Sequence, residues 1–194
     1  MIITLTGPTC AGKTTLEAEL TKLGVGRAIS HTTRAPRAGE VDGLQYHFVS
    51  CETFDEMEMH GDFVESIGFG KHNYALSADA LELASRSFDY TVIVVEPQGA
   101  RQIRNHCLRT GLECATVWVG CDPKDQAHRW VERVKADMEA GKDVSAHADR
   151  LHLMLAEETK WPTQITYELH VNTSAHRPAD AARDLLNTVS DPFF

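Results

Sequence analysis

One short segment near the N-terminus limits the possible folds of this chain more than any other feature. Residues Gly7-Pro8-Thr9-Cys10-Ala11-Gly12-Lys13-Thr14 fit the pattern G-x-x-x-x-G-K-[ST]. The segment follows the apolar stretch Ile2–Thr6 and precedes an amphipathic stretch at 13–23, so we expect a loop between a buried strand and a helix. Glycine lets the backbone approach a ligand closely, and the N-terminus of a helix favours negative charge. The segment therefore predicts a binding site for the phosphates of a nucleoside triphosphate.

Individual residues of this phosphate loop have separate expected roles. Lys13 should reach the β- and γ-phosphates, and the Thr14 hydroxyl should ligate Mg²⁺. The alternative is a chance glycine turn, which the position between strand and helix disfavours. The predicted triphosphate-binding residues are Gly7, Pro8, Thr9, Cys10, Ala11, Gly12, Lys13, Thr14 and Thr15. The motif alone leaves a GTPase, an ATPase motor and a kinase open.

Apolar strands and amphipathic segments alternate along the rest of the chain. The continuous apolar and β-branched run at 90–95 is typical of a parallel strand that is covered on both faces. Further strands are expected at 47–49, 63–65, 114–119 and 168–171, and further helices at 53–60, 78–84, 98–109, 123–140, 145–159 and 178–189. This alternation predicts an α/β fold with a parallel sheet.

Composition excludes several classes of protein. With 194 residues, of which 42% are hydrophobic and 24% charged, the chain is expected to be one soluble domain with small insertions. It contains no apolar run of membrane-spanning length and no signal peptide pattern. Its five cysteines form no C-x-x-C pair, so we expect no disulfide framework, no zinc site and a cytoplasmic location. A formal charge of −9 argues against a nucleic-acid polymer as partner.

A second segment suggests a site for another phosphate. It reads Ser30-His31-Thr32-Thr33-Arg34-Ala35-Pro36-Arg37-Ala38-Gly39-Glu40, and Tyr46-His47-Phe48-Val49 follows shortly after. Arg34 and Arg37 flank a rigid proline, and two guanidinium groups there can hold one phosphate dianion. Tyr46 offers a phenol donor nearby. A solvated basic loop on an acidic protein is the alternative that the residues alone leave open.

This second segment closely resembles the acceptor-binding segment of guanylate kinases, S-x-T-T-R-x-P-R-x-G-E…G-x-x-Y-x-F-V. The phosphate loop, the strand at 92–95 and Gln98-Gly99-Ala100-Arg101 follow in the order of that family. The similarity extends over about residues 2–172 and is most specific up to about Arg104. It implies a P-loop kinase fold: a parallel sheet core flanked by helices, with an inserted acceptor-binding domain and a helical lid. The implied divisions are a core at 1–33, 88–128 and 160–194, a nucleoside-monophosphate-binding insertion at 34–87, and a lid at 129–159.

The resemblance also implies an activity, which is transfer of the γ-phosphoryl group of ATP, bound with Mg²⁺, to GMP or dGMP. Arg34, Arg37, Tyr46 and Tyr74 would hold the acceptor phosphate, and Ser30 and Glu65 would read the base edge. Lys13 and Arg34 would be catalytic, together with the lid residues Arg129, Arg133 and Arg150. Without the resemblance, these three lid arginines are simply the charged faces of two helices. The expected partners are ATP and a nucleoside monophosphate, with no nucleic-acid polymer and no membrane, in a monomer or homodimer.

Two departures from the family pattern leave the identity of the base open. Tyr74-Ala75-Leu76 stands where the family shows Tyr-Gly-[Ser/Thr], so Leu76 lacks the expected hydroxyl, although Ser77 is adjacent. Glu96 stands in a segment where the family shows Asp-x-Asp-x-Gln-Gly. Leu76 and Glu96 are therefore included among the acceptor-binding residues, and the alternative function is a deoxynucleoside monophosphate kinase for another or a modified base.

Two further alternatives remain. A sugar-phosphate kinase related to the family lacks most of this acceptor segment. A guanylate-kinase-like binding module, a scaffold that has lost its activity, lacks working residues in the phosphate loop, whereas Gly12, Lys13 and Thr14 are all present in this chain. The segment between Arg133 and Arg150 is longer and more acidic than the usual lid, so the alignment of the lid arginines is open.

Overall fold

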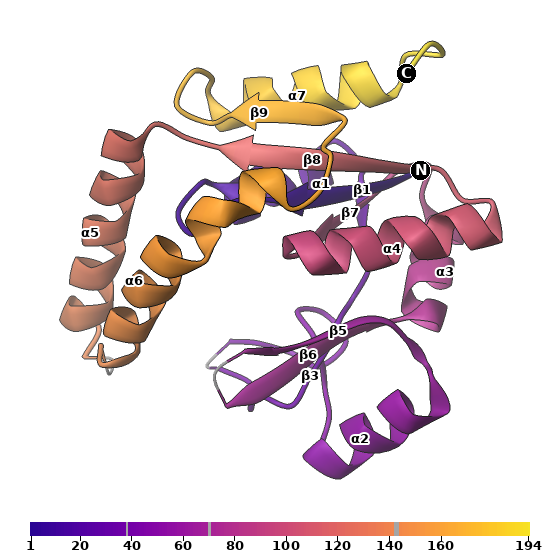
Figure 1. Ribbon diagram of the computed structural model, residues 1–194, viewed down its shortest axis with the longest axis horizontal. Helices are drawn as coiled ribbons and strands as arrows, with labels where there is room; N and C mark the ends of the chain where they lie inside the picture. Colours follow the sequence, from indigo (N-terminus) through magenta and orange to yellow (C-terminus); the bar gives the residue numbers. More distant parts are fainter. Residues whose placement is uncertain (38, 70, 142–143) are drawn as a thin grey trace.

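The core of the molecule is a parallel sheet. The computed structural model describes residues 1–37, 39–69, 71–141 and 144–194 (Figure 1). In these ranges a five-stranded sheet has the order β2-β7-β1-β8-β9, and each neighbouring pair is parallel. The strands are β1 (Ile2–Thr6), β2 (Gly26–Arg27), β7 (Thr91–Val94), β8 (Cys114–Gly120) and β9 (Leu169–Asn172). The expected parallel α/β fold is confirmed, and the strand predicted at 90–95 lies inside the sheet.

Helices cover both faces of this sheet. Leu16 and Leu20 of α1 (Lys13–Lys22) and Leu185 of α7 (Pro178–Val189) pack on one face, against β1, β7 and β8. Ile103 of α4 (Pro97–Thr110) packs on the other face, near Ile93 of β7. The apolar residues of α7 recur at a spacing of three and four, as a helix with one buried face requires.

A second, smaller sheet lies below the core in Figure 1. Its order is β4-β3-β6-β5, with β3 antiparallel to β6 and β6 antiparallel to β5. Its elements are β3 (His31–Thr32), β4 (His47–Phe48), α2 (Cys51–His60), β5 (Phe63–Phe69), β6 (His72–Ser77) and α3 (Ala78–Ser87). The sequence did not predict β6, because Ala75, Leu76 and Ser77 are all buried and show no alternation of apolar and polar residues.

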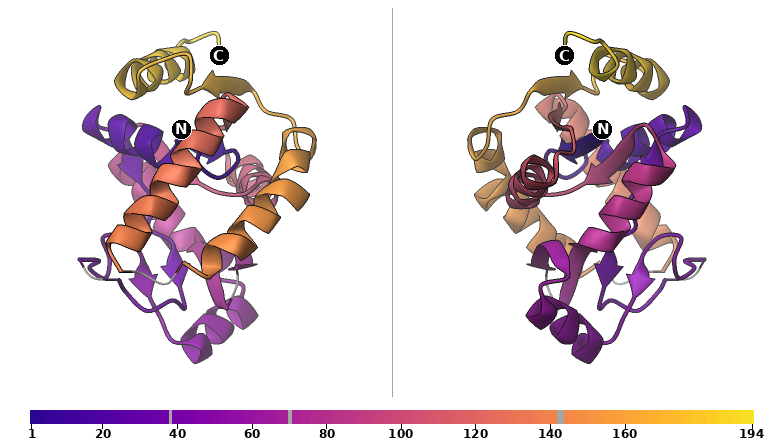
Figure 2. Two further views of the ribbon diagram at one scale, coloured as in Figure 1. Left: turned by 90° about the vertical axis from the view of Figure 1, so that its left-hand side faces the viewer. Right: turned by 90° about the vertical axis from the view of Figure 1, so that its right-hand side faces the viewer.

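Two helices leave the core and return to it at the carboxyl ends of the parallel strands. α5 (Pro123–Glu139) runs outward after β8, and α6 (Ala146–Ala156) runs back (Figures 1 and 2). His147 of α6 joins them, because its ring contacts Trp130 and its Nε2 lies 3.2 Å from Asp137. The helix expected at 145–159 ends earlier, and the chain continues as a 3-10 turn, η1 (Glu158–Thr163). No helix in the described ranges has the length and apolar character to cross a membrane.

Candidate active site

The phosphate loop connects β1 to α1 at the carboxyl edge of the core sheet. A Cβ atom on Gly7 would lie 1.9 Å from the Val119 carbonyl oxygen, so only glycine lets the loop start this close to β8. Gly12 has φ 95° and forms the N-cap of α1. The first turn of α1 carries no acidic residue, and no side chain caps it. Its N–H groups are thus suited to an anion from outside the chain.

Lys13 folds back over this loop. Its Nζ donates to the carbonyl oxygens of Gly7, at 2.6 Å, and Pro8, at 2.9 Å. Burial lowers the pKa of Lys13 to about 8, Arg150 acts in the same direction, and Glu158 partly opposes the shift. The ammonium group therefore lies in a low-dielectric position where a phosphate would stabilise its charged form.

Thr14 and Thr15 occupy the first turn of α1 and are exposed. The Thr14 hydroxyl is an oxygen ligand of the kind that Mg²⁺ accepts, and Mg²⁺ usually takes its remaining ligands from phosphates and water. Among the described residues, no group of three or more histidine, cysteine or acidic side chains could hold a metal by itself. The residues therefore fit a magnesium ion that arrives with a nucleotide.

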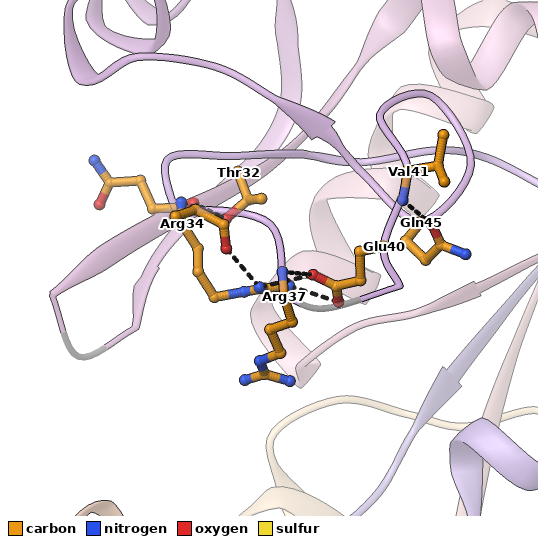
Figure 3. Close-up of polar contacts among 8 residues, drawn as sticks. Thr32, Arg34, Arg37, Glu40, Val41 and Gln45 are labelled. Carbon is orange, nitrogen blue, oxygen red and sulfur yellow. Dashed lines mark hydrogen bonds and ion pairs between the residues drawn. The ribbon is translucent and has the colours of Figure 1, made fainter. Parts of the chain in front are cut away.

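Arg34 is held by a carboxylate in the predicted acceptor segment. Its Nη1 and Nη2 donate to the two oxygens of Glu40 at 2.9 and 3.0 Å (Figure 3). The backbone N–H of Arg37 also donates to Glu40, at 2.7 Å. The Arg34 contact and then the Arg37 N–H lower the pKa of Glu40 to about 2. The Arg37 guanidinium, in contrast, is exposed and points away from this pair in Figure 3, so the two guanidinium groups share a loop but do not converge.

Two tyrosines complete the surroundings of Arg34. Its guanidinium carbon lies 5.5 Å from the centre of the Tyr46 ring, and the rings of Tyr46 and Tyr74 are 5.8 Å apart. Burial raises the pKa of Tyr46, so its phenol stays protonated and remains a donor. The structure thus brings together three of the four residues predicted to bind the acceptor phosphate. Ser30 is half-buried just before β3, and its carbonyl oxygen accepts the N–H of His47.

Glu65 lies in β5 of the small sheet, against the first turn of α4 in the core. It is 6% exposed, and a Cβ atom on Gly99, in the first turn of α4, would lie 3.2 Å from its Oε2. Burial and the nearby Glu96 raise the pKa of Glu65 to about 7. Within the described part of the chain its carboxylate has no hydrogen-bond partner, so it is suited to accept from the N–H groups of a ligand.

Leu76 is the cross-strand neighbour of Glu65. It is 0% exposed and packs with Leu81 and Ile93 in the apolar cluster between the two sheets, so it offers only methyl groups to anything bound beside Glu65. Ser77 does not replace the missing hydroxyl, because successive residues of a strand face opposite sides. Its Oγ accepts the N–H of Ala80 and caps α3, and it lines a different cavity, next to His31.

Glu96 links the two ends of the site. It is the N-cap residue of α4, and burial raises its pKa. Its carboxylate interacts electrostatically with Glu65 at the small sheet, with Lys13 of the phosphate loop, and with Arg150. The geometry at the base-reading end is consistent with this, since Glu65 Oε2 lies against Gly99 in the first turn of the helix that Glu96 caps.

The three arginines of the predicted lid differ in their placement. Arg129 donates to Thr173 at 2.9 Å and to the Cys10 carbonyl oxygen at 3.3 Å. The Nε of Arg150 donates to the Thr9 hydroxyl at 2.9 Å. Arg133 lies one turn further along α5 and is exposed. Two of the three thus contact the phosphate loop.

Sequence reasoning missed several residues of this site. Glu40 holds Arg34, Thr173 joins Arg129 to the Ala11 carbonyl oxygen, and Glu158 binds Thr9. Glu40 lies in the segment that resembles the family, and its position near two arginines could have indicated an ion pair. No sequence pattern indicated the role of Glu158, because a glutamate in a charged helical segment is normally exposed.

Comparisons with known proteins show which family and fold this chain is similar to. The protein-family model described as "Guanylate kinase" matches residues 1–152. A guanylate kinase of Pseudomonas fluorescens is 41% identical over 102 residues, which are 52% of this chain and 50% of the relative, so this match spans only half of that protein. A guanylate kinase of Bifidobacterium longum is 29% identical over 170 residues, 86% of each chain. The crystal structure of guanylate kinase from Anaplasma phagocytophilum superimposes with a TM-score of 0.64 at 18% identity, covering 97% of this chain and 84% of the other.

Proposed function

This chain belongs to the guanylate kinase family, and we propose that it transfers the γ-phosphoryl group of ATP to GMP or dGMP, forming GDP or dGDP. The observation that carries this proposal is geometric: Arg150 Nε donates to Thr9 of the phosphate loop at 2.9 Å, Lys13 Nζ donates to Gly7 of the same loop at 2.6 Å, and Arg34 lies 5.5 Å from the Tyr46 ring in the predicted acceptor segment. The proposal keeps the division into a core, an insertion at 34–87 and a lid at 129–159. A binding module without activity is disfavoured, because Lys13 and the open first turn of α1 are retained.

The proposed reaction depends on positioning rather than on a strong general base. An oxygen of the acceptor phosphate attacks the γ-phosphorus in line while the bond from that phosphorus to the β,γ-bridging oxygen breaks and ADP leaves. The protein orients both groups and neutralises their charge. Lys13 and Arg150 would face the transferring group, while Arg34, Tyr46 and Tyr74 would hold the acceptor phosphate. Thr14 would hold Mg²⁺ together with the ATP phosphates, and the ion would neutralise their charge when bound.

Steady-state kinetics with a panel of acceptors tests the proposal. ATP would be offered with GMP, dGMP, dAMP, dTMP, the 2-aminoadenine deoxynucleotide and 5-hydroxymethyl-dUMP, and formation of the diphosphate measured for each. We expect the highest kcat/KM with GMP or dGMP, because Glu65 accepts hydrogen bonds from the ring N–H and amino group of guanine. Absence of transfer to every acceptor would contradict the kinase assignment.

A second candidate function is supported by Leu76. No hydroxyl stands beside Glu65 at this position, and Ser77 faces the other side of its strand. The guanine O6 atom would therefore lack one hydrogen-bond donor. A different or modified base without this oxygen would lose no hydrogen bond at this position. On this reading the chain is a deoxynucleoside monophosphate kinase whose preferred base is not guanine.

The variant Leu76→Thr separates the two candidates. Restoring a hydroxyl should raise kcat/KM for dGMP relative to the other acceptors by roughly 2- to 13-fold, since one neutral hydrogen bond contributes about 0.5–1.5 kcal/mol. Leu81→Thr is the matched control, because Leu81 is equally buried in the same cluster but does not neighbour Glu65 across the strands. If the wild type prefers GMP or dGMP by about a hundredfold, near 2.7 kcal/mol, and Leu76→Thr changes no ratio, the second candidate is wrong.

The pH dependence of activity should report the charge of Lys13. We expect kcat/KM for ATP to fall as the pH rises through about 8, since burial lowers the pKa of Lys13 to that value and the neutral amine cannot neutralise phosphate. This parameter reports the free enzyme, whereas bound phosphates would keep the ammonium charged and make kcat less sensitive. In Lys13→Arg the guanidinium stays charged, so the decline should disappear from the remaining activity. A decline that persists in Lys13→Arg would assign it to another group.

A further inference from the structure

Thr9 of the phosphate loop is bound by side chains from three later segments. The Gln126 amide of α5 donates to its carbonyl oxygen at 2.9 Å, and Arg150 of α6 donates to its hydroxyl at 2.9 Å. Glu158 of η1 accepts both the Thr9 N–H, at 2.6 Å, and the Thr9 hydroxyl, at 2.7 Å. Thr9 therefore binds side chains of α5, of α6 and of the turn after them.

The hydrogen bonds at Thr9 have one consistent direction. Its hydroxyl has a single hydrogen, and the 2.7 Å contact with the Glu158 carboxylate uses it. The hydroxyl oxygen is then left to accept from Arg150 Nε, while Arg150 Nη2 lies 3.7 Å from the same carboxylate. These hydrogen bonds, from Arg150 to Thr9 and from Thr9 to Glu158, hold the Arg150 guanidinium in one orientation at the edge of the loop.

Glu158 is only 2% exposed, and a buried carboxylate beside a triphosphate site requires an explanation. Burying a charge is costly, and a negative charge here opposes the approach of phosphate. Its positive neighbours are Arg150 and Lys13, both of which interact with it electrostatically. Because Glu158 and a bound phosphate would both be negative, Glu158 is better explained as a residue that positions another side chain than as one that binds the ligand.

We propose that Glu158 is a positioning residue for phosphoryl transfer, which acts through Thr9 to hold Arg150 against the phosphate loop. The inference deepens the proposed function and rests on it, since Arg150 matters only if phosphates bind at this loop. Glu158 itself touches no substrate in this proposal. Its loss should disturb the orientation of Arg150 at Thr9 and leave the acceptor end of the site unchanged.

The variant Glu158→Gln tests this role, with Glu157→Gln as the matched control. Both remove one negative charge from adjacent positions, but Glu157 is exposed and pairs only with Lys160 in the described structure. We expect kcat to fall roughly tenfold to a hundredfold in Glu158→Gln, with KM for the monophosphate within about twofold of the wild type, because orientation rather than acceptor binding is lost. Glu157→Gln should behave as the wild type. Equal kinetics for the two variants would overturn the proposal.

A double-mutant cycle distinguishes positioning from general stabilisation. Arg150→Met should weaken binding of a non-hydrolysable ATP analogue, measured by calorimetry, in the wild-type background but much less in Glu158→Gln, because the arginine is already misplaced there. Additive effects would overturn the proposal. This measurement needs no acceptor, so it remains informative if no monophosphate is phosphorylated, and the two failures can be told apart.

Two further measurements test the proposal if Glu158→Gln does not fold, and distinguish positioning from a purely structural role. If Glu158→Gln does not fold, Thr9→Val removes the connecting hydroxyl, keeps the N–H bond to Glu158, and should reproduce the fall in kcat. In a folded Glu158→Gln protein, the decline of kcat/KM for ATP should begin at lower pH, because Glu158 raises the pKa of Lys13, as Cys10 and Glu96 also do, whereas burial and Arg150 lower it. A merely structural role would lower the melting temperature without moving this pH profile, and that result would contradict the proposal.

Discussion

Replacing Lys13 with alanine is expected to reduce kcat at least a hundredfold while the protein remains folded. The ammonium group lies at the phosphate loop and neutralises charge that develops on the transferring group, an effect of about 2.7 kcal/mol or more. Its contacts in the protein are the carbonyl oxygens of Gly7 and Pro8, and burial already disfavours its charged form. Thermal stability should therefore change little. Steady-state kinetics and a melting curve measure the two effects.

Lys22→Ala is the control for this experiment. Lys22 lies in the last turn of the same helix, is exposed, and pairs with Glu19 at 2.7 Å. Its removal takes away the same charge without touching the loop, so kcat should not change. A Lys13→Ala protein that retained more than about a tenth of the wild-type kcat, a deficit below about 1.4 kcal/mol, would remove the phosphate-loop assignment.

Replacing Arg34 with alanine should damage use of the monophosphate far more than binding of ATP. We expect kcat/KM for the acceptor to fall by about a hundredfold to a thousandfold, since a charge-assisted bidentate contact is lost. Part of this fall comes from Glu40, whose carboxylate would lose Arg34 and repel the acceptor phosphate. Calorimetry with a non-hydrolysable ATP analogue should show nearly unchanged affinity.

The double variant Arg34→Ala/Glu40→Gln separates these two contributions. If repulsion by Glu40 is part of the effect, the double variant should recover some of the lost kcat/KM, and the remainder is the contact between Arg34 and the phosphate. Arg27→Ala is the control, because Arg27 is an ion-paired arginine on β2, outside the small sheet. Equal loss of ATP binding and acceptor use in Arg34→Ala would move this arginine out of the acceptor site.

Features that depend on residues close together in the sequence could be predicted from the sequence alone. The strand Ile2–Thr6 and the helix Pro178–Val189 were predicted with the bounds that the structure has, because an apolar run and a helical spacing are local patterns. The phosphate loop was predicted for the same reason, since its glycines, Lys13 and the following helix are contiguous. The parallel sheet followed from the alternation of strands and helices.

Features that depend on distant partners were decided only by the tertiary structure. The strand β6 is defined by pairing with β3 and β5, and its burial against the core places Leu76 among apolar side chains. Arg37 lies three residues from Arg34 in the sequence, yet Glu40 pairs with the Arg34 guanidinium while the Arg37 guanidinium points elsewhere. Glu158 lies 149 residues from Thr9 in the chain, and only the return of α6 to the core buries its carboxylate at the loop. Burial and pairing across such separations change the role of a charged residue, and no local pattern records them.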